Sequence, residues 1–317
     1  MNDTGWILEP ITQEFVETVG KIAEWQCQSP ADARRMLRRI QARAVGRPSA
    51  HIEDISFPVG PTGSVPVRIV RPSDTQKTLP VIVYVHGGGW SLGDVDTHDR
   101  IVRELAVAAG AVLFFVEYDR SPEARYPVAL EQIYAATAHV VAHGKGLGVD
   151  PTRLAIVGDG AGGNLAAAVT LLALQRRGPK IDLQILFHPI ADADFATPSY
   201  QTFADGPWLT KGAMERFWDA YLPDTAVRNE ITAAPLRASV DQLRGLPDAL
   251  IIVAENDVLR DEGEAYARQL VRAGVRVTSV CYSGTIHGFV ILNALADTPA
   301  TRSAIAQAVA ALRSVLD

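Results

Sequence analysis

Five short apolar runs, separated by stretches of helical periodicity, constrain the fold of this chain more than any other feature. The runs are Val81–Val85, Val112–Val116, Leu154–Val157, Leu183–Phe187 and Leu250–Val253. A strand that is apolar along its whole length is typical of a parallel sheet with helices on both faces. Two alternating segments, Ile52–Phe57 and Val65–Val70, precede these runs and predict a hairpin. The pattern therefore predicts an α/β fold with a mostly parallel central sheet.

Two parts of the chain do not fit the alternation of strands and helices. We expect two opening helices, one over Ile11–Cys27 and one that begins at Pro30 with Ser29 as its N-cap. Between the strands near His188 and Ala249, about 60 residues intervene, too many for an ordinary connection. We therefore expect N-terminal cap helices in residues 1–47 and a core in residues 48–317, with a cap insertion at about 192–240.

The second opening helix is rich in arginine. Arg34, Arg35, Arg38, Arg39 and Arg43 lie away from its predicted apolar stripe. They could bind an acidic ligand, but we interpret them as a solvated helix face.

Charge and cysteine content narrow the class of partner. Thirty Lys and Arg residues against 36 Asp and Glu residues give a net charge of −6, which disfavours nucleic acid and anionic membranes as partners. The longest helical apolar stretch, Leu165–Leu174, is shorter than the roughly 20 residues that span a bilayer. Two cysteines, Cys27 and Cys281, are too few for a disulfide framework or a cysteine zinc site. We expect a cytoplasmic protein, without integral membrane association, that acts on a small molecule.

Two glycine-rich segments directly follow predicted strands. His86–Trp90 places three consecutive glycines at the end of a strand, where backbone N–H groups can form an oxyanion hole. A phosphate-binding loop would need Gly-Lys-Ser or Gly-Lys-Thr, which is missing here. Gly158–Asn164 matches a dinucleotide-binding pattern, but some 150 residues precede it and no acidic residue ends the next strand. A dinucleotide-dependent oxidoreductase is therefore the least favoured of the three functions that we consider for this chain.

An acid and a histidine follow two later strands. Asp257 comes after the strand that ends near Ala254, and His287 comes after the strand that ends near Tyr282. A strand-turn-helix elbow, then an acid, then a histidine is the chain order of an α/β-hydrolase.

The chain resembles the hormone-sensitive-lipase-like esterases, also called bacterial family IV, over nearly its whole length. The segments that carry the resemblance are His86–Gly89, Gly158–Gly163, Asp257–Asp261 (with Val258 in place of a proline) and His287–Phe289. The resemblance implies an α/β-hydrolase fold, with Asp257 orienting His287 as the general base. It also implies an oxyanion hole at Gly88, Gly89 and Ala161, no metal and no organic cofactor.

The same resemblance suggests a homodimer through the last strand, Val275–Tyr282, with a monomer as the alternative. Its substrates would be short- to medium-chain acyl or aryl esters. For the substrate pocket we select four aromatic residues by their position beside these segments or in the cap. They are Trp90, Trp208, Phe203 and Phe289.

Gly160 stands where these esterases carry their nucleophilic serine. Glycine has no Oγ, so an acyl-enzyme cannot form at this position, and we expect a catalytically crippled chain that keeps its fold and binding site. Two explanations remain. The glycine replaces the serine by design, to trap a complex, or the chain is a natural, non-catalytic small-molecule binding protein or receptor on the same fold.

Overall fold

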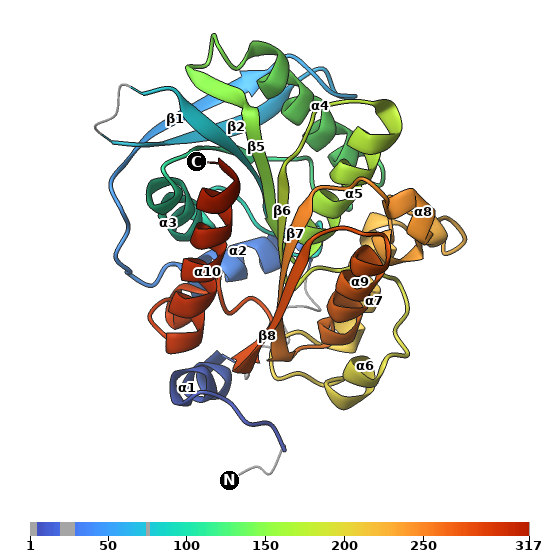
Figure 1. The fold of residues 1–317 in the computed structure, drawn as a ribbon. Coiled ribbons are helices and arrows are strands. Elements are labelled where there is room, and N and C mark those ends of the chain that lie inside the picture. The colour runs from blue at the N-terminus through green and yellow to red at the C-terminus, as the bar shows by residue number, and fades with distance from the viewer. Residues whose placement is uncertain (1–4, 20–28, 74–76, 317) are drawn as a thin grey trace.

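The computed structural model describes residues 5–19, 29–73 and 77–316, and among these residues eight strands form a single sheet (Figure 1). The sheet order is β1-β2-β4-β3-β5-β6-β7-β8. Strands β1, β2 and β4 pair antiparallel, and every pairing from β4 through β3 to β8 is parallel. The strands are β1 Ala50–Phe57, β2 Val65–Pro72, β3 Leu79–Val85, β4 Val112–Val116, β5 Val149–Asp159, β6 Leu183–Phe187, β7 Asp248–Asn256 and β8 Val277–Ile286. The α/β-hydrolase fold class expected from the sequence is confirmed.

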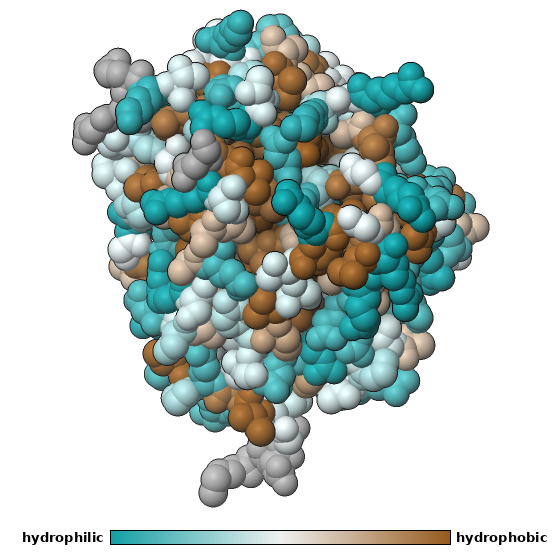
Figure 2. Space-filling model, viewed as in Figure 1, coloured by the Kyte–Doolittle hydropathy of each residue, from teal (hydrophilic) through white to brown (hydrophobic). Residues whose placement is uncertain are grey.

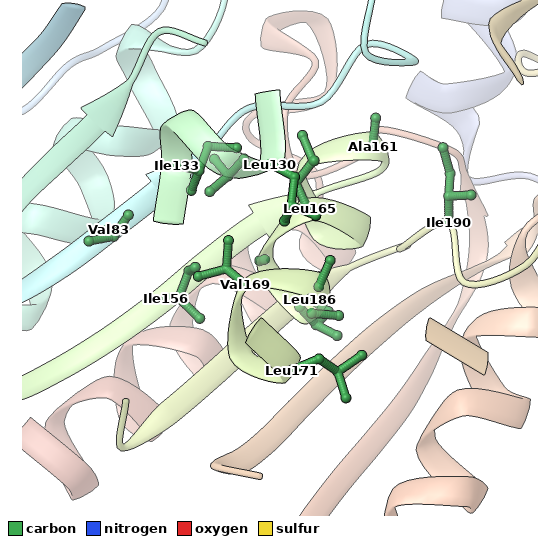
Figure 3. Close-up of a cluster of buried hydrophobic side chains, with 14 of the residues drawn as sticks. Val83, Leu130, Ile133, Ile156, Ala161, Leu165, Val169, Leu171, Leu186 and Ile190 are labelled. Atoms are coloured by element: carbon green, nitrogen blue, oxygen red, sulfur yellow. The ribbon is translucent and has the colours of Figure 1, made fainter. Parts of the chain in front are cut away.

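Helices cover both faces of the sheet, which explains why the central strands are apolar along their length. On one face, α3 (Asp99–Ala109) and α10 (Pro299–Leu316) pack on side chains such as Ile82 and Val157. On the other face lie α4 (Val128–His143), α5 (Ala161–Arg176) and α9 (Arg260–Arg272). Figure 3 shows this second interface, where strand residues such as Val83 and Ile156 meet helix residues such as Leu165.

The opening segment forms α1 (Pro10–Val19) and α2 (Pro30–Gln41). Ser29 caps α2 as predicted, because its side chain accepts a hydrogen bond from the backbone N–H of Asp32. The predicted end of the first helix at Cys27 lies outside the described residues.

Two arginines of α2 correct the interpretation of this helix as a solvated face. Arg34 donates to the carbonyl oxygens of Ser91 (2.7 Å) and Ser121 (2.9 Å), and Arg38 pairs with the buried Asp94 at 2.7 Å. These groups lie more than fifty residues away in sequence, so the helix pattern alone could not reveal them. The arginines therefore help to fasten α2 over the loop that follows β3.

The long connection between β6 and β7 contains several short helices and one longer helix. It contains α6 (Pro198–Thr202), α7 (Lys211–Tyr221), η2 (Val227–Asn229), η3 (Pro235–Arg237) and α8 (Val240–Leu243), and a further short helix, η4 (Asn293–Leu295), follows β8. The division into residues 1–47 and 48–317, with a cap insertion at about 192–240, stays a prediction.

The surface shows no large separation of residue types on the side viewed in Figure 2, where hydrophilic and hydrophobic residues are interspersed. Within the described ranges, none of the helices has the length and apolar character needed to cross a membrane.

Gly162 marks the tightest contact between the first turn of α5 and β3. A Cβ at this position would collide with the carbonyl oxygen of Val85 and the backbone of His86. We expect Gly162→Ala to lower the free energy of unfolding by about 1–3 kcal/mol, the typical cost of overpacking a filled site. Chemical denaturation measures the change.

Gly46→Ala is the matched control, since a Cβ at Gly46 would meet nothing within 4 Å. We expect it to change the free energy of unfolding by less than about 0.5 kcal/mol. Equal stabilities for the two variants would contradict the packing argument.

Candidate active site

A single residue, Gly160, makes the turn between the end of β5 and the start of α5. Its backbone has φ 50° and ψ −115°, a conformation that L side chains rarely adopt. Its N–H donates to the carbonyl oxygen of Phe187 at 2.9 Å, and its own carbonyl oxygen accepts from the N–H of Asn164 at 3.0 Å. The turn is therefore fixed by hydrogen bonds on both sides of the glycine.

Position 160 has room for a side chain, unlike the neighbouring glycines. A Cβ built on Gly160 would meet only Nε2 and Cε1 of His287, at 3.4 and 3.5 Å, which is ordinary van der Waals contact. A Cβ on Gly158 would instead collide with the backbone of Gly162, and one on Gly163 would press on Pro189 at 3.0 Å. Close packing therefore accounts for the flanking glycines, whereas position 160 faces the imidazole.

Asp257 and His287 follow the carboxyl ends of the adjacent strands β7 and β8. Nδ1 of His287 lies 2.8 Å from Oδ2 of Asp257, and the other carboxylate oxygen accepts from the N–H of Leu259 at 3.0 Å. Asp257 is 2% exposed, so its hydrogen bonds are shielded from water. A carboxylate on Nδ1 holds the proton there and leaves the Nε2 lone pair facing Gly160.

His188, at the end of β6, packs against the ring of His287. The two ring centroids are 4.4 Å apart at an interplanar angle of 61°. Burial, together with the nearby His287, lowers the pKa of His188 to about 3. At neutral pH this ring is therefore uncharged, and it supports His287 without repelling an imidazolium there.

The glycine loop after β3 is hydrogen-bonded to Asp159, the residue that precedes the turn at Gly160. One carboxylate oxygen of Asp159 accepts from the N–H of Gly87 at 3.0 Å and from the hydroxyl of Tyr84 at 2.9 Å. Burial alone would raise the pKa of Asp159, but His98 and the hydrogen bond from Tyr84 lower it to about 2. Asp159 is thus ionised, and it joins the two glycine-rich segments that the sequence placed far apart.

A pocket opens between the two glycine-rich segments on one hand and the helices α2 and α7 on the other. Gly88, Gly89, Ala161 and His287 line it. Its apolar wall includes Leu37 from α2, Leu92, Ile190, Trp208, and Met214 and Phe217 from α7. The structure therefore brings the predicted acid, histidine and oxyanion segments together at an apolar pocket.

The four predicted aromatic pocket residues divide into two groups. Trp208 lines the pocket, but Trp90, Phe203 and Phe289 are buried outside its lining. Trp90 stacks on Tyr221 with ring centroids 4.3 Å apart, so it packs between the glycine loop and α7.

Sequence reasoning missed most of the apolar wall. Met214 and Phe217 are three residues apart on α7 and share a face, and this spacing was the available signal. A Cβ on Gly89 would overlap the Phe217 ring, so the aromatic ring lies directly against the glycine loop.

Comparison with known proteins supports this geometry. A family model described as alpha/beta hydrolase fold matches residues 82–291. Carboxylesterase NlhH of Mycobacterium tuberculosis is 38% identical over 288 residues, which cover 90% of this chain and 89% of the relative. Ethyl acetate hydrolase of Pseudomonas putida is 33% identical over 287 residues, or 89% of this chain and 90% of the relative.

Solved esterase structures superpose over almost the entire chain. A thermostable esterase from Pseudomonas putida has a TM-score of 0.96 and 46% identity, with 98% of each chain covered. A serine-to-alanine mutant of esterase rPPE, complexed with (S)-Ac-CPA, has a TM-score of 0.95, 46% identity and 98% coverage of each chain.

Two buried histidines predict a loss of stability in mild acid. Burial is the main cause that lowers the pKa of both His86 and His188 from 6.5 to about 3. Below pH 6.5 the unfolded chain therefore binds protons that the native chain does not, so stability falls as the pH falls. At pH 5 we expect a loss of roughly 2 kcal/mol for each histidine, measured by urea unfolding between pH 7.5 and pH 5.

His188→Phe tests whether His188 contributes to this loss of stability in acid. Neither ring nitrogen of His188 has a hydrogen-bond partner among the described residues, so phenylalanine replaces the ring without breaking a hydrogen bond seen there. The variant should lose about half as much stability between pH 7.5 and pH 5 as the parent chain. Identical pH dependence in the two proteins would show that His188 does not titrate on unfolding.

Proposed function

The chain belongs to the alpha/beta hydrolase family, and from that premise we propose that its site is a carboxylesterase site of the hormone-sensitive-lipase type, with Gly160 at the position of the nucleophilic serine. The names of its relatives support carboxylic ester hydrolysis as the chemistry of this scaffold. In the present chain the nucleophile is missing, so the double-displacement route through an acyl-enzyme is closed.

One observation carries this proposal. The backbone at Gly160 is bent into a conformation that a side chain rarely adopts, yet a Cβ there would fit and would face Nε2 of His287 at 3.4 Å. A strained elbow that aims a short side chain at a histidine is the arrangement that activates a serine.

With serine at position 160, the chemistry would run in two steps. The hydroxyl oxygen attacks the ester carbonyl carbon while Nε2 of His287 takes its proton, and Asp257 stabilises the resulting imidazolium. The N–H groups of Gly88, Gly89 and Ala161 stabilise the oxyanion. His287 then protonates the leaving alcohol, and water releases the acid from the enzyme by the reverse sequence.

The substrate class we propose is an ester with a short- to medium-chain acyl group or an aryl group. The pocket lining combines the candidate N–H donors with apolar side chains, including Met214 and Phe217. Such a lining suits a small ester whose carbonyl is polar and whose two substituents are apolar. The bound ligand in the rPPE mutant supports a small-molecule substrate for this chain.

Residues 1–47 and the insertion at about 192–240 would act as a cap, since α2 and α7 both contribute to the pocket wall. We also place the protein in the cytoplasm, as a homodimer that forms at the outer edge of β8, the terminal strand of the sheet.

A non-catalytic receptor or binding protein is the second candidate. The observation that favours it is the missing side chain at Gly160 in a site whose other parts are in place. Such a protein would bind small esters or acids in the pocket, and restoring the serine would not give turnover.

Gly160→Ser separates the two functions. We expect this variant to hydrolyse short aryl esters such as p-nitrophenyl acetate with kcat on the order of 10⁴-fold or more above the parent chain, because loss of a triad serine has effects of that size. Spectrophotometric release of p-nitrophenol measures the rate.

His287→Ala in the Gly160→Ser background is the control, and it should remove the gain. A folded Gly160→Ser variant with no increase in hydrolysis would overturn the esterase proposal and leave the binding protein.

Trp208→Ala, also in the Gly160→Ser background, tests the pocket wall. Removing an indole from the lining should shift the preference between acetate and longer acyl esters by about tenfold in kcat/KM, since one or two methylenes are worth 1–3 kcal/mol. Phe203→Ala is the matched control, because Phe203 is buried outside the lining. An unchanged chain-length profile for Trp208→Ala would remove this residue from the substrate pocket.

A further inference from the structure

We propose that the space in front of His287, which Gly160 leaves free of a side chain, lets this chain hydrolyse esters by direct attack of water, in a single displacement. The inference rests on the site proposed above, but it assigns an activity to the chain as it stands. It requires a position for the water, a base to activate it and a place for the charge that develops.

The position is the part of the pocket beside Nε2 of His287, into which a side chain of residue 160 would project. Apart from its chain neighbours, a Cβ on Gly160 would meet only His287 within 4 Å, through Nε2 at 3.4 Å and Cε1 at 3.5 Å. A water oxygen cannot lie at the Cβ point itself, which is one bond length from Cα, but with no side chain at residue 160 the pocket beside Nε2 is open to a water that hydrogen-bonds to this nitrogen. The same ring lines the pocket together with Gly88, Gly89 and Ala161, so a water beside Nε2 shares the pocket with the candidate oxyanion donors.

The base is held in the form that accepts a proton at this point. Asp257 binds Nδ1 of His287 at 2.8 Å and is itself fixed by the N–H of Leu259. Nε2 is therefore the basic nitrogen, and the buried carboxylate stabilises the cation that forms when it takes a proton. The neighbouring His188 is uncharged at neutral pH and does not oppose that cation.

The step balances without any further reactant. The water oxygen forms a bond to the carbonyl carbon, its proton moves to Nε2 of His287, and the carbonyl π electrons move to the oxygen that the N–H groups stabilise. When the tetrahedral adduct collapses, the bond to the alcohol oxygen breaks and His287 returns the proton to that oxygen. The products are one acid and one alcohol, and no covalent bond to the protein forms.

Glycine and alanine therefore differ at position 160, although neither has a nucleophile. An alanine methyl would stand 3.4 Å from Nε2 and take up part of the space that the water needs. A site that merely lost its serine would be equally inactive with either residue. A site that uses water should be active with glycine and blocked with alanine.

The experiment compares the full chain with Gly160→Ala, Gly160→Ser and His287→Phe in steady-state hydrolysis of p-nitrophenyl acetate. The parent chain should exceed Gly160→Ala by at least about tenfold and His287→Phe by about 10²-fold, the usual contribution of a general base. The parent should turn over without a burst and without mass gain from a serine-directed fluorophosphonate. Gly160→Ser should show both the burst and the covalent adduct.

Gly160→Ser also serves as the folding control, because serine and alanine carry the same backbone strain at φ 50°. Equal rates for the parent and Gly160→Ala, with Gly160→Ser active, would overturn the single-displacement activity and leave the esterase site intact. A folded but inactive Gly160→Ser would overturn the proposed function itself.

Discussion

The contact between the loop after β3 and the turn after β5 holds the site together. At Gly162 the first turn of α5 approaches the end of β3 so closely that no side chain fits, and at Gly87 the loop lies directly on Asp159. The ionised Asp159 then joins the two segments by accepting hydrogen bonds from Gly87 and Tyr84. Because parallel strands end at the same sheet edge, this contact brings together residues more than seventy positions apart.

The order of the motifs along the chain predicted the acid, the histidine and the glycine loop better than it predicted the pocket wall. Apolar runs such as Val81–Val85 predict buried strands because burial on both faces leaves a local pattern, and the structure contains each of them. The pairing of Asp257 with His287 was implied by the family resemblance, together with the chain order of an acid and then a histidine after two later strands. The pocket wall could not be predicted in this way, since Leu37 and Phe217 come from helices whose docking depends on distant groups. Arg34 is an example, because it binds carbonyl oxygens of two separate loops.

Under the proposed function, the site is preorganised around a reaction for which one group is missing. The imidazole is oriented by a buried carboxylate and the turn at Gly160 is set by the backbone, so neither depends on a nucleophile at position 160. Electrostatic preorganisation of this kind gives rate enhancement even without the serine. In the proposed scheme, the absence of a side chain at Gly160 therefore changes the route of the reaction more than it changes the architecture around it.

The open turn at Gly160 also has a genetic consequence. A glycine codon that ends in a pyrimidine becomes a serine codon through one base change. Apart from the chain neighbours of Gly160, a Cβ at this position meets only His287 within 4 Å, although a serine there carries the backbone strain of φ 50°. Under the proposed function, this base change alone would add the nucleophile of covalent catalysis, and selection for folding would act against it through that strain.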